Sequence, residues 1–290
     1  MRIPVLVPIA SFCVALSLAL VPGQAGAVPS VFSASGANPA GIQATVDAFR
    51  ADLGALNPNV AGSFSSGRRE INWDGVPDAA SAPNNLPANF FNVNSPRGVV
   101  FSTPGTGFQV SATAASGTAI EFGNLNATYT AEFQTFSPQR LFTALGSNVV
   151  DVRFFVPGTT TAALTRGFGS VFTDVDIANV TSLAFFDVND NPLGTFFVPA
   201  GSNGGLSFLG VDFGNAAVRR VRITSGNAAL GGVESGNDLV VMDDFIYAEP
   251  AAVTEPGTLA LLLAGLSGLG LMARQRRGAR PDKISLTGSA

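Results

Sequence analysis

The chain has 290 residues and a formal net charge of −4 at pH 7, with no histidine and one cysteine, Cys13. The lack of histidine excludes Ser-His-Asp triads, Cys-His dyads, the usual catalytic zinc sites and the ordinary general base at neutral pH. Residues 28–256 contain ten arginines, no lysine and nineteen carboxylates. This acidic balance argues against nucleic acid as a partner, because phosphate binding needs a positive surface.

Residues 1–27 have the pattern of a secretory signal peptide. Arg2 opens a short basic region, an apolar stretch follows over residues 5–21, and Ala25-Gly26-Ala27 is a small-x-small cleavage site. We therefore predict an exported chain that begins at Val28. The alternative is an N-terminal anchor that is not cleaved.

Residues 28–62 are expected to form an N-terminal helical segment. Apolar side chains recur every three or four residues at Ile42, Val46, Phe49, Leu53 and Leu56. This spacing predicts a short amphipathic helix over residues 39–56 that packs on the core and ends at Asn57-Pro58-Asn59.

Residues 63–247 are expected to form a mainly β domain, because short apolar runs alternate there with Gly, Pro, Asn and Asp. The expected strands cover residues 98–102, 107–112, 119–122, 149–156, 167–173, 182–187, 194–199, 206–213, 218–224 and 239–247. Many short strands and few helices favour an antiparallel β-sandwich, jelly-roll-like in organisation. The 23 phenylalanines suit such a core, because Phe needs no polar partner.

A loop at residues 68–78 holds the single tryptophan of the chain among charged side chains. Trp73 and Asp74 follow Arg69 and Glu70, and an exposed indole beside hydrogen-bonding groups is suited to stack on a sugar ring. These four residues are the candidate ligand-binding site. The alternative is a buried Trp73 with an arginine–carboxylate network that fixes the loop. The stretch at residues 68–75 resembles stretches in uncharacterised secreted bacterial proteins.

Acidic residues near the end of the domain are candidate Ca²⁺ ligands. The predicted last strand contains Asp243 and Asp244, whose side chains are expected on opposite faces of the sheet, with Asp238 just before it. This ending resembles the final strand of jelly-roll, galactose-binding-like domains, which implies a structural Ca²⁺. The alternative is an ion pair with an arginine. A second acidic run at residues 187–191 suits either Ca²⁺ or a hairpin turn.

The C-terminal region combines a linker, an apolar run and a basic tail. The linker at 248–256 ends in Glu255 and Pro256, and the run at 257–273 predicts a transmembrane helix. The tail at 274–290 is expected in the cytoplasm by the positive-inside rule. Its first arginines are Arg274, Arg276 and Arg277.

This order of Glu-Pro, apolar helix and arginines resembles the PEP-CTERM sorting signal. The resemblance implies a Gram-negative source that makes exopolysaccharide and an exosortase-type enzyme as a partner. It also implies export through the inner membrane, with the membrane contacted through the C-terminal helix, and a final place at the cell surface or outside the cell.

The leading functional expectation is a non-enzymatic protein of the extracellular matrix, associated with exopolysaccharide or biofilm and without a catalytic site or a required cofactor. One alternative is a carbohydrate-binding module that uses Trp73 and its neighbours. A second alternative is a polysaccharide-cleaving enzyme with a carboxylate pair such as Glu70 and Asp74, because glycosidases work without histidine.

Overall fold

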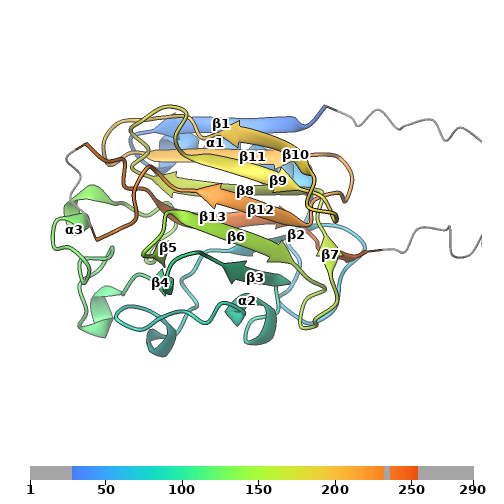
Figure 1. Ribbon diagram of the computed structural model, residues 1–290, viewed down its shortest axis with the longest axis horizontal. Helices are drawn as coiled ribbons and strands as arrows, with labels where there is room; N and C mark the ends of the chain where they lie inside the picture. The colour runs from blue at the N-terminus through green and yellow to red at the C-terminus, as the bar shows by residue number, and fades with distance from the viewer. Residues whose placement is uncertain (1–27, 232–235, 254–290) are drawn as a thin grey trace, which may run out of the picture.

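The computed structural model describes residues 28–231 and 236–253. The expected signal peptide, transmembrane helix, basic tail and sorting residues lie outside these ranges. Within them the protein is mainly β, every pair of neighbouring strands is antiparallel, and helices are few (Figure 1). No helix of the described part is both long enough and apolar enough to cross a membrane.

The larger sheet has seven strands in the order β1-β11-β8-β13-β5-β4, and β2 pairs with β13 beside that path. The strands are β1 (Ser30–Gly36), β2 (Arg68–Ile71), β4 (Gly107–Val110), β5 (Phe142–Leu145), β8 (Gly167–Thr173), β11 (Leu206–Asp212) and β13 (Val241–Ala248). The central strand β13 thus has β8 on one side and two successive partners, β5 and β2, on the other.

The smaller sheet has five strands in the order β10-β9-β12-β6-β3. These are β3 (Val99–Ser102), β6 (Val149–Phe154), β9 (Ser182–Phe186), β10 (Pro192–Phe197) and β12 (Arg220–Thr224). A short pair joins β7 (Ala163–Leu164) to β14 (Ala251–Ala252). The helices are α1 (Pro39–Leu53), α2 (Phe90–Val93) and α3 (Tyr129–Glu132), with 3-10 turns η1 (Asp78–Ala80) and η2 (Ala114–Ser116).

Side chains from both sheets meet in one hydrophobic core. Phe168 and Phe245 of the larger sheet belong to the same buried cluster as Phe154 and Phe185 of the smaller one. The Phe168 and Phe245 rings lie 5.2 Å apart and the Phe154 and Phe168 rings 6.3 Å apart, in edge-to-face arrangements. Such contacts between rings stabilise beyond the area that they bury.

Helix α1 covers the larger sheet, as its periodicity predicts. Its apolar face contributes Ile42, Val46, Phe49 and Leu53 to a second buried cluster, together with side chains of β8, β11 and β13. The helix ends three residues before the expected Leu56, because Gly54 adopts a φ of 99°. Leu56 is 56% exposed and pairs with Arg68 in an isolated bridge.

Three expectations about strands are wrong. Residues 68–71 were expected in a loop, but they form β2 and pair with β13. Residues 30–36 lie in the segment expected to be helical, yet they form β1 and pair along their whole length with β11. Residues 119–122 were expected to form a strand, but they make a bridge and a turn in which Glu121 and Phe122 have φ values of 51° and 62°. The predicted hairpin at residues 187–194 is confirmed, since β9 pairs with β10 across it.

The Phe49 ring of α1 packs against two glycines of the larger sheet, Gly169 and Gly210. A carbon added to Gly210 would lie 2.9 Å from the Phe49 ring, and one added to Gly169 would lie 2.8 Å from it. The helix therefore approaches β8 and β11 closely because these positions carry no side chain.

The variant Gly210→Ala is expected to lower the free energy of unfolding by about 1–3 kcal/mol, since the added methyl forces the Phe49 ring to move. Urea unfolding of both proteins measures the difference. Gly75→Ala is the matched control, because nothing lies within 4 Å of its added carbon, and its effect is expected to stay within about 0.5 kcal/mol. Equal stability of the two variants would contradict this account of helix packing.

Candidate functional site

The candidate site forms around an irregularity in β13. Between Met242 and Phe245 the pairing with β8 shifts by one residue, which is a β-bulge at Asp243 and Asp244. On the other side, β5 pairs with β13 at Met242, whereas β2 pairs with it from Phe245 onward. The two aspartates therefore lie where β13 changes its partner strand.

The expectation that these carboxylates lie on opposite faces is wrong, because the bulge interrupts the alternation of side chains. Both reach the same residue: the Ser137 hydroxyl lies 2.7 Å from Asp244 Oδ1 and 3.3 Å from Asp243 Oδ1. Asp243 Oδ2 also accepts hydrogen bonds from the backbone amides of Phe136 at 2.6 Å and Ser137 at 3.2 Å. Burial raises the pKa of Asp243 well above its usual range, and the nearby Asp244 raises it further.

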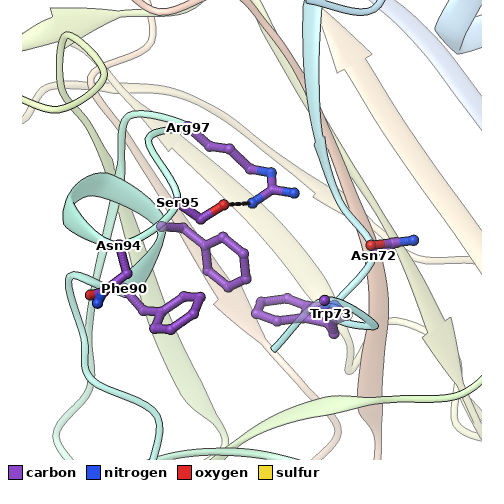
Figure 2. A pocket seen from close by; sticks show the side chains of 8 residues that line it. Asn72, Trp73, Phe90, Asn94, Ser95 and Arg97 are labelled. Atoms are coloured by element: carbon purple, nitrogen blue, oxygen red, sulfur yellow. Dashed lines mark hydrogen bonds between the residues drawn. The ribbon is translucent and has the colours of Figure 1, made fainter. Parts of the chain in front are cut away.

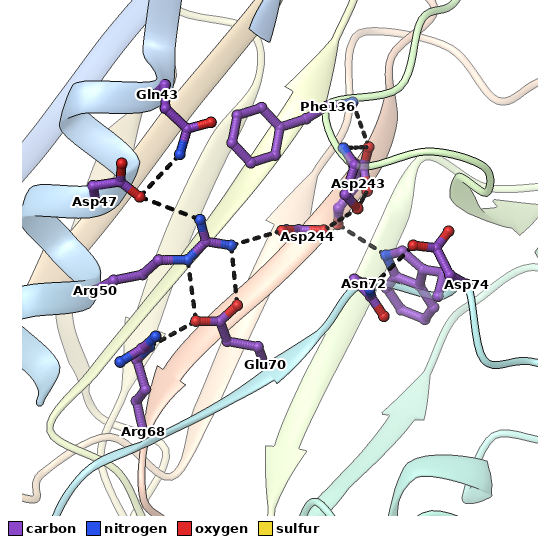
Figure 3. Close-up of polar contacts among 12 residues, drawn as sticks. Gln43, Asp47, Arg50, Arg68, Glu70, Asn72, Asp74, Phe136, Asp243 and Asp244 are labelled. Atoms are coloured by element: carbon purple, nitrogen blue, oxygen red, sulfur yellow. Dashed lines mark hydrogen bonds and ion pairs between the residues drawn. The ribbon is translucent and has the colours of Figure 1, made fainter. Parts of the chain in front are cut away.

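An arginine of α1 joins these carboxylates to β2 (Figure 3). Arg50 Nη2 lies 3.0 Å from Asp244 Oδ2 and 3.0 Å from Glu70 Oε2, while Arg50 Nε donates to Glu70 Oε1 at 3.1 Å. Arg68 Nε donates to the same Glu70 oxygen at 2.6 Å. Burial raises the pKa of Asp244, and the Arg50 charge opposes that rise. The alternative to a Ca²⁺ site, in which one of these aspartates pairs with an arginine, is thus confirmed for Asp244.

Trp73 is buried, so the expectation of an exposed indole is wrong, and the alternative interpretation, a buried Trp73 beside an arginine–carboxylate network, is confirmed. Its side chain is 1% exposed, its Nε1 donates to the Asp243 carbonyl at 2.9 Å, and its ring stacks on Phe142 with centroids 4.1 Å apart. Phe91 and Phe245 contact it in edge-to-face arrangements. With both faces of the ring surrounded by protein, the indole offers no platform to a sugar.

Arg69 is also buried rather than available to a ligand. Its guanidinium is fully covered, and it makes a two-point pair with Glu249, with Nε 2.7 Å from Oε2 and Nη2 2.8 Å from Oε1. The other donors reach backbone carbonyls of Pro58, Val60, Gly62 and Pro96 at 2.9–3.1 Å. Arg69 therefore ties two loops to the end of β13.

Asp74 belongs to another set of hydrogen bonds. Its Oδ1 accepts from the backbone amides of Gln139 at 2.6 Å and Arg140 at 3.2 Å, and burial raises its pKa. Asp74 and Glu70 therefore have separate partners.

Two adjoining hollows open beside this network. One, of about 180 Å³, is lined by Asn72, Trp73, Gly75, Phe90, Phe91, Asn94, Ser95 and Arg97 (Figure 2). The other, of about 340 Å³, is lined by Arg50, Leu56, Asn59, Glu70, Asn72, Arg97, Ser137 and Asp244. Asn72 and Arg97 line both hollows, so the two form one polar surface region.

The acidic residues predicted to bind Ca²⁺ do not converge. Asp238 lies apart from the bulge network, and its Oδ1 accepts from the backbone amide of Asp176 at 2.9 Å. No group of three or more acidic, histidine or cysteine side chains in the described ranges is arranged to hold a metal. In the run at 187–191, Asp187 Oδ1 accepts hydrogen bonds from the backbone amides of Asn189 and Asn191 at 2.8 Å each. These bonds close a hairpin turn, as the second of the two interpretations predicts.

Arg50 and Ser137 of the network, and Arg97 beside it in both hollows, were missed from the sequence. Arg50 does not belong to the apolar face of the predicted helix, so the spacing that predicts the helix assigns it no role. Ser137 and Arg97 lie outside regular strands, and nothing in their local sequence marks them.

Glu249→Gln is expected to lower the free energy of unfolding by about 3 kcal/mol, because it leaves the buried Arg69 charge without a counter-charge. Thermal or urea unfolding measures the loss. Glu121→Gln makes the same chemical change at a half-buried glutamate whose pKa is raised by burial alone, and it is expected not to destabilise. Equal stability of Glu249→Gln and the parent would contradict the role of this pair.

Comparison with protein families matches residues 252–277 to the PEP-CTERM protein-sorting motif. This range contains the predicted sorting residues Glu255, Pro256, Arg274, Arg276 and Arg277, and it confirms the resemblance. No curated protein and no solved structure matches the chain. The chain thus carries a PEP-CTERM sorting signal, which implies an exported protein that an exosortase processes and sorts to the cell surface or the extracellular space.

Proposed function

We propose that this protein is a non-enzymatic component of the extracellular matrix, in which a jelly-roll-like β-sandwich contacts exopolysaccharide or neighbouring proteins. The observation that carries this proposal is the sorting motif at residues 252–277. The proposed sandwich is supported by the core that the two antiparallel sheets share. The buried aromatic side chains of this core stabilise the folded body that the sorting motif would display.

The arrangement of the carboxylates supports a structural role over polysaccharide cleavage. A glycosidase needs two carboxyl groups that flank one glycosidic bond, one of them free to donate a proton. Glu70 is held by Arg50 and Arg68, and Asp74 accepts two backbone amides elsewhere. Each carboxylate is therefore occupied by its own partners.

Glycan recognition is the second candidate function, at the polar region formed by the two hollows. Asn59, Asn72 and Asn94 are exposed there, and the partly exposed Arg97 lies between the two hollows. Amide and guanidinium groups donate and accept the hydrogen bonds that sugar hydroxyls need. This candidate differs from the sequence-based one, because its contacts are amides rather than the buried Trp73 and Arg69.

The double variant Asn72→Ala, Asn94→Ala is expected to lower polysaccharide binding by about fivefold to a hundredfold. Each lost hydrogen bond to an uncharged partner is worth about 0.5–1.5 kcal/mol, and about 1.4 kcal/mol corresponds to a factor of ten. Co-sedimentation of the purified protein with insoluble polysaccharides and with producer-derived polymer measures the dissociation constant.

The matched control is Asn189→Ala, which removes an exposed amide in the hairpin turn between β9 and β10. This variant is expected to bind as the parent does. If the parent binds a polymer and the double variant binds it equally well, the polar region is not the contact surface. If the parent binds no polymer, glycan contact is wrong, and a matrix role would have to use protein partners.

A further inference from the structure

The terminal strands of the two sheets differ in how their outer edges are protected. The larger sheet ends in β4 on one side, and there the backbone amides of Ala82 and Leu86 donate to carbonyls of β4 at 2.8 Å each. In the smaller sheet, the Phe101 amide of β3 donates to the Ala88 carbonyl at 2.9 Å. The other terminal strand, β10, begins with Pro192 and has a register shift directly after it. Covering segments, prolines and bulges all keep an edge strand from pairing with another chain.

The fourth terminal strand, β1, has none of these protections. It pairs with β11 in an unbroken register over all seven residues, Ser30–Gly36. Its outer side pairs with no other segment of the described chain. It contains no proline and no charged residue, and Figure 1 shows it as the outermost strand of its sheet. Every second residue of such a strand turns its N–H and C=O groups outward, so β1 offers a row of unused donors and acceptors.

The sequence around β1 is also free of charge. No side chain from Val28 to Val46 is charged, whereas residues 28–256 contain nineteen carboxylates and ten arginines. Asp212 of β11 lies opposite Ser30, and its charge is paired with Arg166. Two copies of an acidic chain repel each other, and the repulsion is smallest where neither copy presents a charge. The edge of β1 is therefore where a second copy can approach.

The side chains of β1 fit a second β1 that runs in the opposite direction. When Ser33 lies opposite Ser33 of the second copy, each larger side chain meets a small one. Val31 then lies opposite Ser35, and Phe32 lies opposite Ala34. No pair brings like charges together, which would destabilise the pairing of strands. The strand is thus complementary to itself about Ser33, as the symmetric contact of two identical subunits requires.

We propose that β1 pairs antiparallel with β1 of a second copy of this chain and joins the two larger sheets into one continuous sheet. Backbone hydrogen bonds supply the affinity when one strand is added to the edge of another sheet. The contact has seven residues on each side, so the association is expected to be weak and reversible. As a contact within a matrix, the pairing rests on the proposed function, for which it names the neighbouring protein.

The pairing also sets the direction of the two copies. The start of β1 and the end of the described chain at residue 253 lie at the same end of the molecule (Figure 1). Because the two paired strands run in opposite directions, the two copies of residue 253 lie at opposite ends of the pair. The contact therefore suits copies that meet from opposing sides, and it does not suit neighbours with the same orientation.

The first test is a disulfide cross-link through Ser33→Cys. Ser33 is exposed, and the only native cysteine, Cys13, lies in the predicted signal peptide. Opposite residues of antiparallel strands have Cα atoms about 4.5–5.5 Å apart, which a disulfide can bridge. Mild oxidation of the concentrated, purified protein is expected to give a dimer on a non-reducing gel, and a reductant is expected to reverse it.

The matched control is Thr195→Cys, which replaces an exposed hydroxyl residue on the protected edge strand β10. This variant is expected to stay largely monomeric under the same oxidation. Random collision would cross-link both variants alike, so the difference between them measures pairing at β1.

The second test is sedimentation velocity of the purified protein over a range of concentrations. The mean mass of the parent is expected to rise towards that of a dimer. Ser33→Lys places two positive charges opposite each other at the centre of the contact, so it is expected to abolish the association. Its Tm is expected to match that of the parent, because Ser33 is exposed. Thr195→Lys is expected to associate as the parent does.

A parent that remains monomeric up to about 1 mM would overturn the proposal, since any affinity would then be weaker than about 1 mM. Equal cross-linking of Ser33→Cys and Thr195→Cys would overturn it too. Association that persists in Ser33→Lys would place the contact on another surface and would equally overturn it. These measurements contain no polysaccharide, so their failure is distinct from a failure of polymer binding in the co-sedimentation test.

Discussion

The bulge in β13 is the constraint on which the arrangement of the candidate site depends. β13 is the central strand of the larger sheet, and at Asp243 and Asp244 it passes from pairing with β5 to pairing with β2. The carbonyl of Asp243 accepts the Trp73 indole, and the side chain of Asp244 accepts Arg50. One extra residue in one strand therefore decides where a loop, a helix and two sheet segments meet.

Arginine is the only basic residue type in residues 28–253, and its geometry suits the contacts found. A planar guanidinium with five donors can bind a carboxylate at two points and still reach carbonyls on other segments. Arg69 does this in full burial. Arg50 binds Glu70 at two points and also reaches the Asp244 carboxylate, so it joins α1 to β2 and β13. A lysine at either place would supply one point charge and leave several acceptors without a donor. The buried charges of this protein thus order loops rather than mark an exposed site.

The elements that the sequence predicted correctly are those whose apolar residues recur with a regular period. The amphipathic helix follows from the spacing of Ile42, Val46 and Phe49, and strands such as β8 and β11 follow from apolar runs between turn residues. β1 was missed because residues 28–62 were assigned to a helical segment. Its sequence has only two large apolar side chains, Val31 and Phe32, and its strand form depends on pairing with β11.

The candidate site could be predicted only in part. The charged stretch at residues 68–74 was singled out as a loop, but Arg68–Ile71 form β2. The burial of Trp73 depends on Phe91, Phe142 and Phe245, which lie far away in the sequence. The partner of Asp244 comes from a helix nearly two hundred residues earlier. Local patterns contain no information about such distant contacts, and a bulge changes which face a residue occupies without changing its neighbours in the chain.

The ends of the described chain have a geometric consequence. The start of β1 and the end of the described chain at residue 253 lie at the same end of the molecule, with α3 at the other (Figure 1). The sorting motif begins at residue 252, which is still paired with β7. An enzyme that recognises this motif therefore meets it where the last strand pairing of the folded body ends.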